Sequence, residues 1–253
     1  MLATIARYSL REALQNRVLG LLLGLLLAGF LLAEFVGAVA LTEQQAVQAA
    51  LLGSLLRVGS VLIIALFVVA TLLREQQDRT LELVLSLAQP RGQYVAGKLL
   101  AYSALALMLA LACGALVLLY AEPLVALRWC LSLACELSLV AAFGLLLAFT
   151  FRQPVAALAA LLAVYALARV LGALLLIAHE SPFSQGGAFD AFAAGFLGVL
   201  DWLLPALYRF TEAGWLAYGT GSWGDFGLVV AQTAIYLPLL AAAAMFDLYR
   251  REW

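Results

Sequence analysis

Of the 253 residues in this chain, 66% are hydrophobic and only 11% are charged. Soluble globular domains carry charge on about a quarter of their residues, so this composition excludes an ordinary water-soluble fold and indicates a membrane protein. The 14 basic and 15 acidic side chains nearly cancel, so no bulk positive field points to a nucleic-acid partner. Cys113, Cys130 and Cys135 lie in apolar stretches without Cys-x-x-Cys spacing, so we expect small buried side chains rather than a disulfide or metal site.

The first predicted element is an amphipathic helix over residues 1–17. Apolar residues recur at helical spacing on one face, at Leu2, Ile5, Ala6, Leu10, Ala13 and Leu14. Because Arg7, Arg11 and Gln15 lie opposite, such a helix should rest in the headgroup plane before the chain enters the bilayer. A short solvated tail is the alternative. No small-residue cleavage site follows, so we expect the first span to remain in the mature protein.

Six segments are long and apolar enough to cross the bilayer as helices, which takes about 20 residues. They are residues 18–41, 51–73, 98–120, 124–150, 155–178 and 226–248. Arginine and lysine gather in the connections on one side of these spans, and aspartate and glutamate gather on the other. The positive-inside rule then places both termini in the cytoplasm. The sequence therefore predicts one all-α membrane domain, residues 1–253, with six transmembrane helices.

Between the second and third spans, residues 74–97 form a polar connection on the cytoplasmic side. Charged side chains occupy its first part, at Arg74, Glu75, Asp78, Arg79 and Glu82. Asp78 or Thr80 could cap a short helix, and Pro90 would end it. We expect an amphipathic helix over residues 80–87 that lies across the cytoplasmic ends of the two spans.

The end of this connection nearly matches a phosphate-binding loop, as Gly92-x(4)-Gly97-Lys98-Leu99. That motif needs Ser or Thr after the lysine to ligate magnesium, and a strand before the glycine loop. Leu99 stands at that position and Lys98 opens a membrane span. We therefore do not expect this chain to bind or hydrolyse ATP itself.

Ionisable residues deep inside the predicted spans are functional hypotheses by default, because each costs about 2.5–3.5 kcal/mol on insertion scales. Glu34 and Arg57 both lie about 10 Å below the outer boundary by the helical rise, so adjacent antiparallel spans could pair them. Glu136 and Arg169 lie nearer the midplane, at about 13–18 Å, and form a second predicted pair. Each pair could be structural, or it could line a polar substrate path.

The long outer connection, residues 179–225, contains two apolar segments that are each too short to cross, 188–200 and 202–218. Amphipathic aromatic rings suit the headgroup level, and five occur here: Trp202, Tyr208, Trp215, Tyr218 and Trp223. We predict a re-entrant helical hairpin that dips into the outer leaflet. Two further full spans are the competing interpretation, against which Asp201 and Arg209 argue.

The charged connection resembles the segment by which permease subunits of ABC type-2 transporters contact their ATPase. That family typically shows Glu, then Gly-Thr-Leu-Glu, a leucine-rich turn, Pro, a basic residue and Gly-Lys. The matching residues in this chain are Glu75, Arg79, Thr80, Leu81, Glu82, Leu85, Pro90, Arg91, Gly97 and Lys98. Arg79 stands where the family often has Gly, and arginine is compatible with a helix. The whole layout is also similar, above all to the compact permeases of the nitrous oxide reductase maturation system.

The resemblance implies that the connection contains a coupling helix, which sits in a groove of a separate ATPase subunit. Glu75, Arg79 and Glu82 would then pair with the surface of that subunit, and Leu81 and Leu85 would fill its groove. ATP and magnesium would bind to the ATPase, and this chain would bind no cofactor. The implied setting is a bacterial cytoplasmic membrane, with membrane lipids, a second permease chain (identical or a close relative) and a periplasmic accessory protein as partners. A solvated loop is the alternative.

Three other functions were weighed against an ATP-driven exporter. A hydrolase would need His179, Glu180 and Ser181 to converge, which sequence neighbours on one turn rarely do, so we expect no enzyme. A secondary transporter usually shows two halves related by an internal repeat, and none is visible between the first and last three spans. The last alternative is a non-transporting membrane module that relays the motion of an ATPase.

Overall fold

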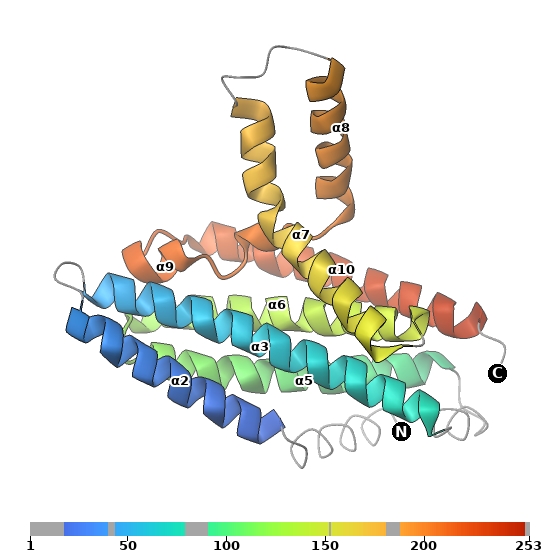
Figure 1. Cartoon of the computed structure of the whole chain (residues 1–253), viewed down its shortest axis with the longest axis horizontal. Helices are drawn as coiled ribbons and strands as arrows, with labels where there is room; N and C mark the ends of the chain where they lie inside the picture. The colour runs from blue at the N-terminus through green and yellow to red at the C-terminus, as the bar shows by residue number, and fades with distance from the viewer. Residues whose placement is uncertain (1–17, 40–43, 79–90, 152, 181–187, 251–253) are drawn as a thin grey trace.

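The computed structural model describes residues 18–39, 44–78, 91–151, 153–180 and 188–250 (Figure 1). The elements in chain order are α2 (Val18–Val39), α3 (Gln44–Gln77), α5 (Arg91–Val117), α6 (Pro123–Thr150), α7 (Pro154–Glu180), α8 (Ala188–Leu203), the 3-10 turn η1 (Leu207–Arg209), α9 (Ala213–Tyr218) and α10 (Trp223–Arg250). The described part of the chain contains helices and no strand. Two expected elements, the interfacial helix over 1–17 and the coupling helix over 80–87, lie outside the described residues.

Six helices of the described chain are long and apolar enough to cross a membrane: α2, α3, α5, α6, α7 and α10. They coincide with the six predicted spans, so the prediction of a multi-pass membrane protein is confirmed. The longest is α3, with 34 residues. At 1.5 Å per residue it is about 51 Å long, whereas the hydrocarbon core of a bilayer is about 30 Å thick. This helix therefore extends well past the apolar layer.

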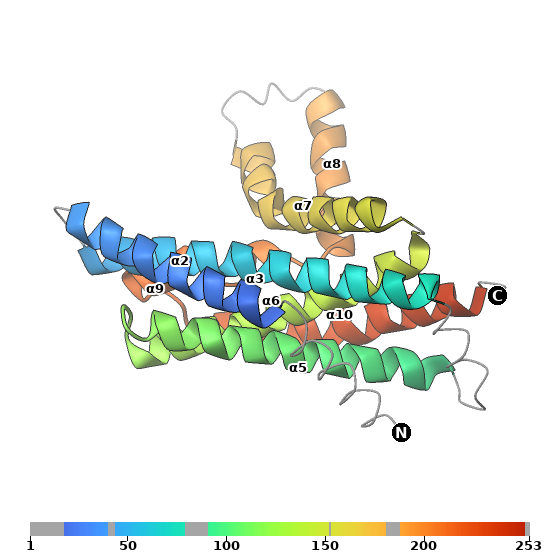
Figure 2. The same cartoon turned by 60° about the horizontal axis from the view of Figure 1, so that its bottom comes forward.

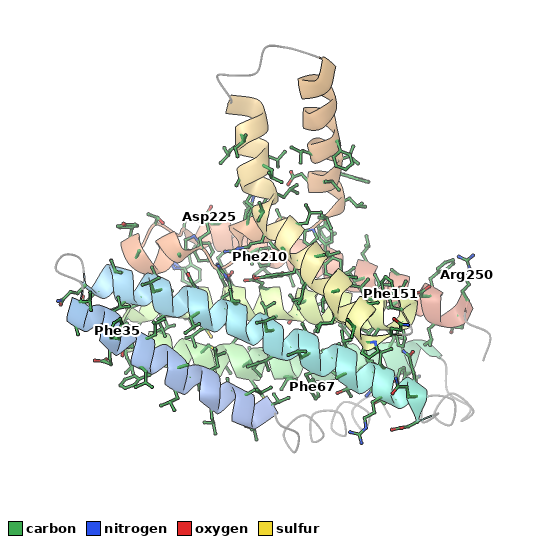
Figure 3. The ribbon with its side chains drawn as sticks, viewed as in Figure 1. Phe35, Phe67, Phe151, Phe210, Asp225 and Arg250 are labelled. Carbon is green, nitrogen blue, oxygen red and sulfur yellow. The ribbon has the colours of Figure 1, made fainter. Side chains whose placement is uncertain are left out.

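The two ends of the described helical bundle differ in how many basic residues they carry. Arg74, Arg91, Lys98 and Arg250 lie toward one end, named the basic end below, together with Glu75, Asp78 and Asp247. From this end residues 79–90 connect α3 to α5. Arg128 and Arg209 lie toward the other end, named the acidic end because Glu122, Glu212 and Asp225 lie there. Figure 3 shows Arg250 and Asp225 well separated along the bundle.

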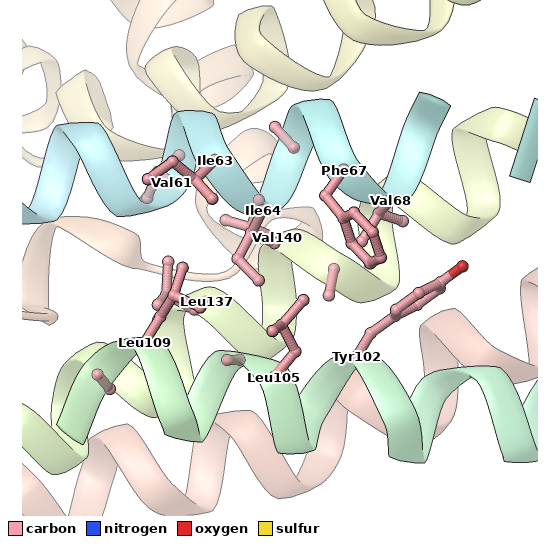
Figure 4. Packing of buried hydrophobic residues seen from close by; sticks show 14 of the residues in the cluster. Val61, Ile63, Ile64, Phe67, Val68, Tyr102, Leu105, Leu109, Leu137 and Val140 are labelled. Carbon is pink, nitrogen blue, oxygen red and sulfur yellow. The ribbon is translucent and has the colours of Figure 1, made fainter. Parts of the chain in front are cut away.

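Helix α6 is the centre of the bundle, since it packs against α3, α5, α7 and α10 and is buried along most of its length. Figure 4 shows Leu137 and Val140 of α6 packed among the side chains of α3 and α5. In the same cluster Phe67 meets Tyr102 edge to face, with ring centroids 6.0 Å apart. Apolar faces alone do not hold helices together in lipid, so close packing of this kind supplies the attraction.

Helices α5 and α6 approach especially closely at Gly114. A Cβ atom at this position would lie only 2.8 Å from the Cβ and Sγ atoms of Cys130. Small residues at such crossings bring two backbones together and increase their van der Waals contact in a membrane. The contact explains why a glycine occupies this position in the last turn of α5.

Helix α7 crosses the bundle, and its C-terminal part then projects sideways together with α8 (Figures 1 and 2). Because α8 has 16 residues, it is about 24 Å long and too short to cross a bilayer. Large apolar side chains on this projecting pair are exposed, at Leu176, Ile177, Phe196, Val199 and Trp202.

The second arm of the predicted hairpin, residues 202–218, is not one helix. Helix α8 ends at Leu203, and the chain then forms η1, an irregular stretch and the short helix α9. Pro205 removes a backbone donor next to the end of α8, and Thr211 has φ of 43°, which no α-helix allows. As a result α8 lies beside the end of α7 rather than beside a helix that follows it.

Candidate functional site

The irregular stretch between η1 and α9 lies deep inside the bundle. Thr211 is 1% exposed and contacts Glu136, which is near the middle of α6. By the helical rise Glu136 lies about 20 Å from either end of that helix. Non-helical backbone at this depth of a membrane has no water to satisfy its polar groups, so protein side chains must supply the hydrogen bonds.

Two arginines supply donors to the carbonyl groups of this stretch. Arg57 of α3 donates from Nη1 to the carbonyl oxygen of Thr211 at 2.8 Å. Arg169 of α7 donates from Nη1 to the carbonyl oxygens of Leu207 and of Phe210, the latter at 2.6 Å. Its Nη2 atom reaches the carbonyl oxygen of Thr211 at 3.5 Å. Helices α3 and α7 therefore hold the same short piece of backbone.

Helix α6 holds the same stretch through a carboxylate and a hydroxyl group. The carboxylate of Glu136, which is fully buried, accepts hydrogen bonds from the hydroxyl group of Thr211 and, at 2.8 Å, from that of Tyr165. The hydroxyl oxygen of Ser132 accepts a hydrogen bond from the backbone N–H of Thr211 at 3.0 Å. Nη1 of Arg169 lies 4.0 Å from Oε1 of Glu136.

We name this assembly the Thr211 clamp, and its members are Arg57, Ser132, Glu136, Tyr165, Arg169 and Thr211. A non-glycine residue at positive φ costs about 1–3 kcal/mol and persists only where its surroundings hold it in place. Hydrogen bonds to charged groups contribute about 1.5–3 kcal/mol each, so the clamp can offset that strain. The arrangement ties three spans to one strained residue, and a shift of any of these spans changes its hydrogen bonds.

Of the two predicted ion pairs, Glu136 and Arg169 do lie together, whereas Glu34 and Arg57 do not pair. Glu34 instead accepts a hydrogen bond from the hydroxyl group of Tyr120 at 2.6 Å. The guanidinium group of Arg57 points to Thr211. Equal depth is therefore insufficient for pairing, because the rotation of each helix about its axis decides which neighbour a side chain meets.

A second polar group lies at the basic end, where Glu75 of α3 meets Tyr94 and Lys98 of α5. The carboxylate of Glu75 accepts a hydrogen bond from Tyr94 Oη at 2.6 Å and forms an ion pair with Lys98. The side chain of Lys98 is only 3% exposed, and its ammonium group lies 5.9 Å from the ring centroid of Tyr102. We name this group the Glu75 tie, because it joins the two helices that flank the charged connection.

The structure places the remaining predicted ATPase contacts only in part. The central ones lie outside the described residues: Arg79, Thr80, Leu81, Glu82, Leu85 and Pro90. Arg91 is the first residue of α5, and Gly97 is buried in the same helix next to Lys98. Glu75 and Lys98, also predicted to contact the ATPase, form an ion pair with each other within the chain.

Three members of the clamp were not predicted from the sequence: Ser132, Tyr165 and Thr211. Ser132 and Tyr165 could have been found from residue spacing. Ser132 lies one helical turn from Glu136, and Tyr165 lies one turn from Arg169, so each shares a helix face with a predicted site residue. Thr211 could not have been found in this way, since its conformation depends on partners far away in the sequence. Among the described residues, no group of three or more His, Cys, Asp or Glu side chains could hold a metal ion.

No protein-family model matches this chain, and no curated protein is significantly similar to it.

Proposed function

We propose that this chain is the membrane-spanning permease subunit of an ATP-driven ABC transporter of the type-2 exporter class. Two permease chains, identical or closely related, assemble with two separate ATPase subunits that bind ATP and magnesium. The basic end faces the cytoplasm of a bacterial cell, in agreement with the positive-inside rule, and both termini lie on that side. The six spans and the charged connection between α3 and α5 support this assignment.

The observation that carries the proposal is that one helix, α3, belongs to both polar groups. Its Glu75 forms the tie beside the charged connection, and its Arg57 holds the Thr211 clamp. These two residues are about 27 Å apart along the helix by its rise. A packed helix is a rigid element, so a displacement at the basic end reaches the middle of the membrane.

The mechanism follows from these contacts. Closure of the ATPase subunits on nucleotide moves the charged connection, and the Glu75 tie makes α3 and α5 move together. Arg57 moves with α3, which weakens its bond to the carbonyl oxygen of Thr211 and frees the strained backbone to rearrange. The projecting pair formed by α8 and the end of α7 then moves to open a path toward the outer face.

A test combines co-purification with a coupling assay. The full-length chain, extracted gently from native membranes, should retain an ATPase subunit whose ATP turnover rises when the complex is reconstituted in lipid. Glu82→Lys should abolish that rise without preventing membrane insertion, because it reverses a charge predicted to pair with the ATPase. Glu122→Lys, a charge reversal at an exposed position at the other end of the bundle, is the control. Unchanged stimulation in the Glu82 variant argues against the coupling role.

A secondary transporter is the second candidate, and the Thr211 clamp is the observation in its favour. Such transporters form their binding sites from helices that are broken near the midplane, and the stretch from η1 to Thr211 is broken backbone at that depth. An ABC transporter needs an ATPase subunit and ATP, whereas a secondary transporter needs neither. Uptake or efflux by the purified chain in vesicles that lack any ATPase and nucleotide would select the secondary transporter.

A further inference from the structure

A polar cavity lies beside the Thr211 clamp, on its side toward the acidic end. It has a volume of about 430 Å³ and lies among η1, α9 and the start of α10. Apart from one leucine, its lining consists of Tyr208, Arg209, Glu212, Trp215, Thr220 and Asp225. Ligand sites in proteins commonly have volumes of about 300–1,000 Å³, so this cavity can take a small organic group.

The lining carries two carboxylates and one guanidinium group, and the guanidinium group of Arg169 also acts on Glu212 from beside the cavity. The guanidinium group of Arg209 lies over the ring of Tyr208, 5.4 Å from its centroid. One carboxylate is already used, since Oδ2 of Asp225 accepts hydrogen bonds from the backbone N–H and the hydroxyl group of Ser222 at 2.9 and 2.7 Å. The other carboxylate, that of Glu212, is therefore the anionic group that the cavity offers to a ligand.

Glu212 is the carboxylate that remains available. In the described part of the chain, no residue donates a hydrogen bond to the side-chain carboxylate of Glu212 or forms an ion pair with it within 4.0 Å, although its backbone carbonyl oxygen accepts one from the N–H of Trp215 at 3.2 Å. Partial burial raises the pKa of Glu212, and the guanidinium group of Arg169 opposes that rise. A cation bound beside this carboxylate would relieve the cost of its desolvation.

The aromatic rings of the cavity indicate which kind of cation it would bind. Tyr208 and Trp215 both line the cavity, and aromatic faces attract ammonium groups, with aromatic-lined pockets selecting alkylated ammonium. The cavity does not offer the cluster of oxygen ligands that a metal ion needs, since Glu212 and Asp225 are its two carboxylates. We propose that this cavity binds the ammonium group of an organic amine, with Glu212 as the counter-ion and Tyr208 and Trp215 as the aromatic wall.

The same chemistry could reach the cavity on a lipid headgroup or on a free amine. The neighbouring surface favours the headgroup, because α9 also borders an apolar groove of about 330 Å³. That groove is lined mostly by small or apolar residues of α3 and α9, among them Ala46, Ala50, Ala213 and Ala217. An amphiphile could place its ammonium group in the cavity and an acyl chain in the groove.

The experiment uses the purified full-length chain and distinguishes the two sources. In one arm, the chain is reconstituted in nanodiscs that contain phosphatidylglycerol with or without phosphatidylethanolamine, and retained lipid is counted by native mass spectrometry. In the other arm, ethanolamine is titrated calorimetrically into the chain in detergent. Retention of phosphatidylethanolamine supports the headgroup, and binding of ethanolamine supports the free amine.

Glu212→Gln is the test variant, since it removes the charge and keeps the shape of a side chain that holds no other group in place. We expect it to weaken ammonium binding at least tenfold in whichever arm is positive. The matched control is Glu122→Gln at the same end of the bundle, where Glu122 is exposed and its side chain makes no capping bond to α6. The control should bind as the unaltered chain does.

The proposal is overturned if neither arm shows binding, or if Glu212→Gln binds as well as the control does. Equal melting temperatures for the two variants show that any difference is not a folding defect. The test contains no ATPase and no nucleotide, so its result does not depend on the function proposed above.

Discussion

Arg57 of α3 and Arg169 of α7 both donate to the carbonyl oxygen of Thr211, at 2.8 and 3.5 Å. Two cations thus converge on one carbonyl group near the midplane of the bundle, with the carboxylate of Glu136 beside them. Irregular backbone at this depth is stable only when its polar groups have partners within the protein. The two arginines are therefore needed for this stretch to fold, because they supply donors to its carbonyl groups. A role in transport would be additional to this structural role.

The first prediction concerns the loss of one of these cations. Arg169→Met should destabilise the protein by about 3–5 kcal/mol, because it leaves a buried carboxylate without its cation and removes the donor to the carbonyl group of Phe210. Thermal unfolding in detergent measures the change. Arg74→Met is the control, since Arg74 is 76% exposed and its ion pair with Asp78 is at the surface. Similar melting temperatures for both variants would show that the clamp adds little stability.

The second prediction tests the hydrogen bond of the Thr211 hydroxyl group separately from the size of the side chain. Thr211→Val keeps the shape but removes the donor to Glu136, so it should cost about 1–3 kcal/mol, the penalty for an unpaired buried acceptor. Thr211→Ser keeps the donor and should cost less than half as much. Unfolding in denaturant compares the two variants, and a larger effect for serine would contradict the role given to the hydroxyl group.

The third prediction concerns the Glu75 tie. Glu75→Leu leaves Lys98, which is 3% exposed, without its counter-charge and should destabilise the protein by about 3–5 kcal/mol. The double variant Glu75→Leu, Lys98→Leu removes both charges and should recover more than half of that loss. A double-mutant cycle on melting temperature measures the coupling. If the destabilisation by the double variant equals the sum of those by the two single variants, Glu75 and Lys98 do not stabilise each other.

The fourth prediction concerns the crossing of α5 and α6. Gly114→Val should destabilise the protein or prevent its folding, because even a Cβ atom would lie 2.8 Å from Cys130. Overpacking of this kind costs about 1–3 kcal/mol. The double variant Gly114→Ala, Cys130→Gly should fold, since it adds a Cβ atom on α5 and removes the Cβ and Sγ atoms that this atom would meet on α6. Both can be scored by the fraction of monodisperse protein in size-exclusion chromatography, where an intact Gly114→Val protein would be the unexpected result.

The fifth prediction concerns orientation. Arg74→Cys and Glu122→Cys introduce thiols at exposed positions at the basic and acidic ends. A membrane-impermeant maleimide added to intact cells should label the Glu122 variant alone, and inside-out vesicles should reverse the result. The native Cys113 and Cys130 are buried, which limits background labelling. Labelling of the Arg74 variant from outside the cell would invert the topology and remove the basis for a cytoplasmic ATPase.

Much of the fold could be predicted from residue order. A span must contain about 20 apolar residues, which is a property of a single segment, and all six predicted spans coincide with long helices. The predicted limits were too short at several ends, for example for α3, because charged and polar residues such as Glu75 continue a helix past the apolar layer. The approach of Glu136 to Arg169 also followed from the depth of each residue along its own helix.

Other contacts between side chains of different helices could not be predicted, because they depend on how each helix is rotated about its axis. Glu34 and Arg57 have matching depths, yet one binds Tyr120 and the other binds Thr211. Adjacent residues on a helix point about 100° apart, so a small rotation of a helix exchanges one partner for another. The prediction for 202–218 failed for a related reason, since helical propensity and Pro205 are local, whereas the hydrogen bonds that hold Thr211 at positive φ come from three other helices.

Sequence by itself determined the solvent, the number of spans and the asymmetry of charge between the two ends, because each depends on transfer energies that add residue by residue along the chain. Tertiary structure alone decided which charges meet, where the backbone leaves the helical form, and which carboxylate faces a cavity. Those outcomes depend on distances of a few ångströms between residues far apart in the chain, and hydrogen bonds and ion pairs form only at such distances.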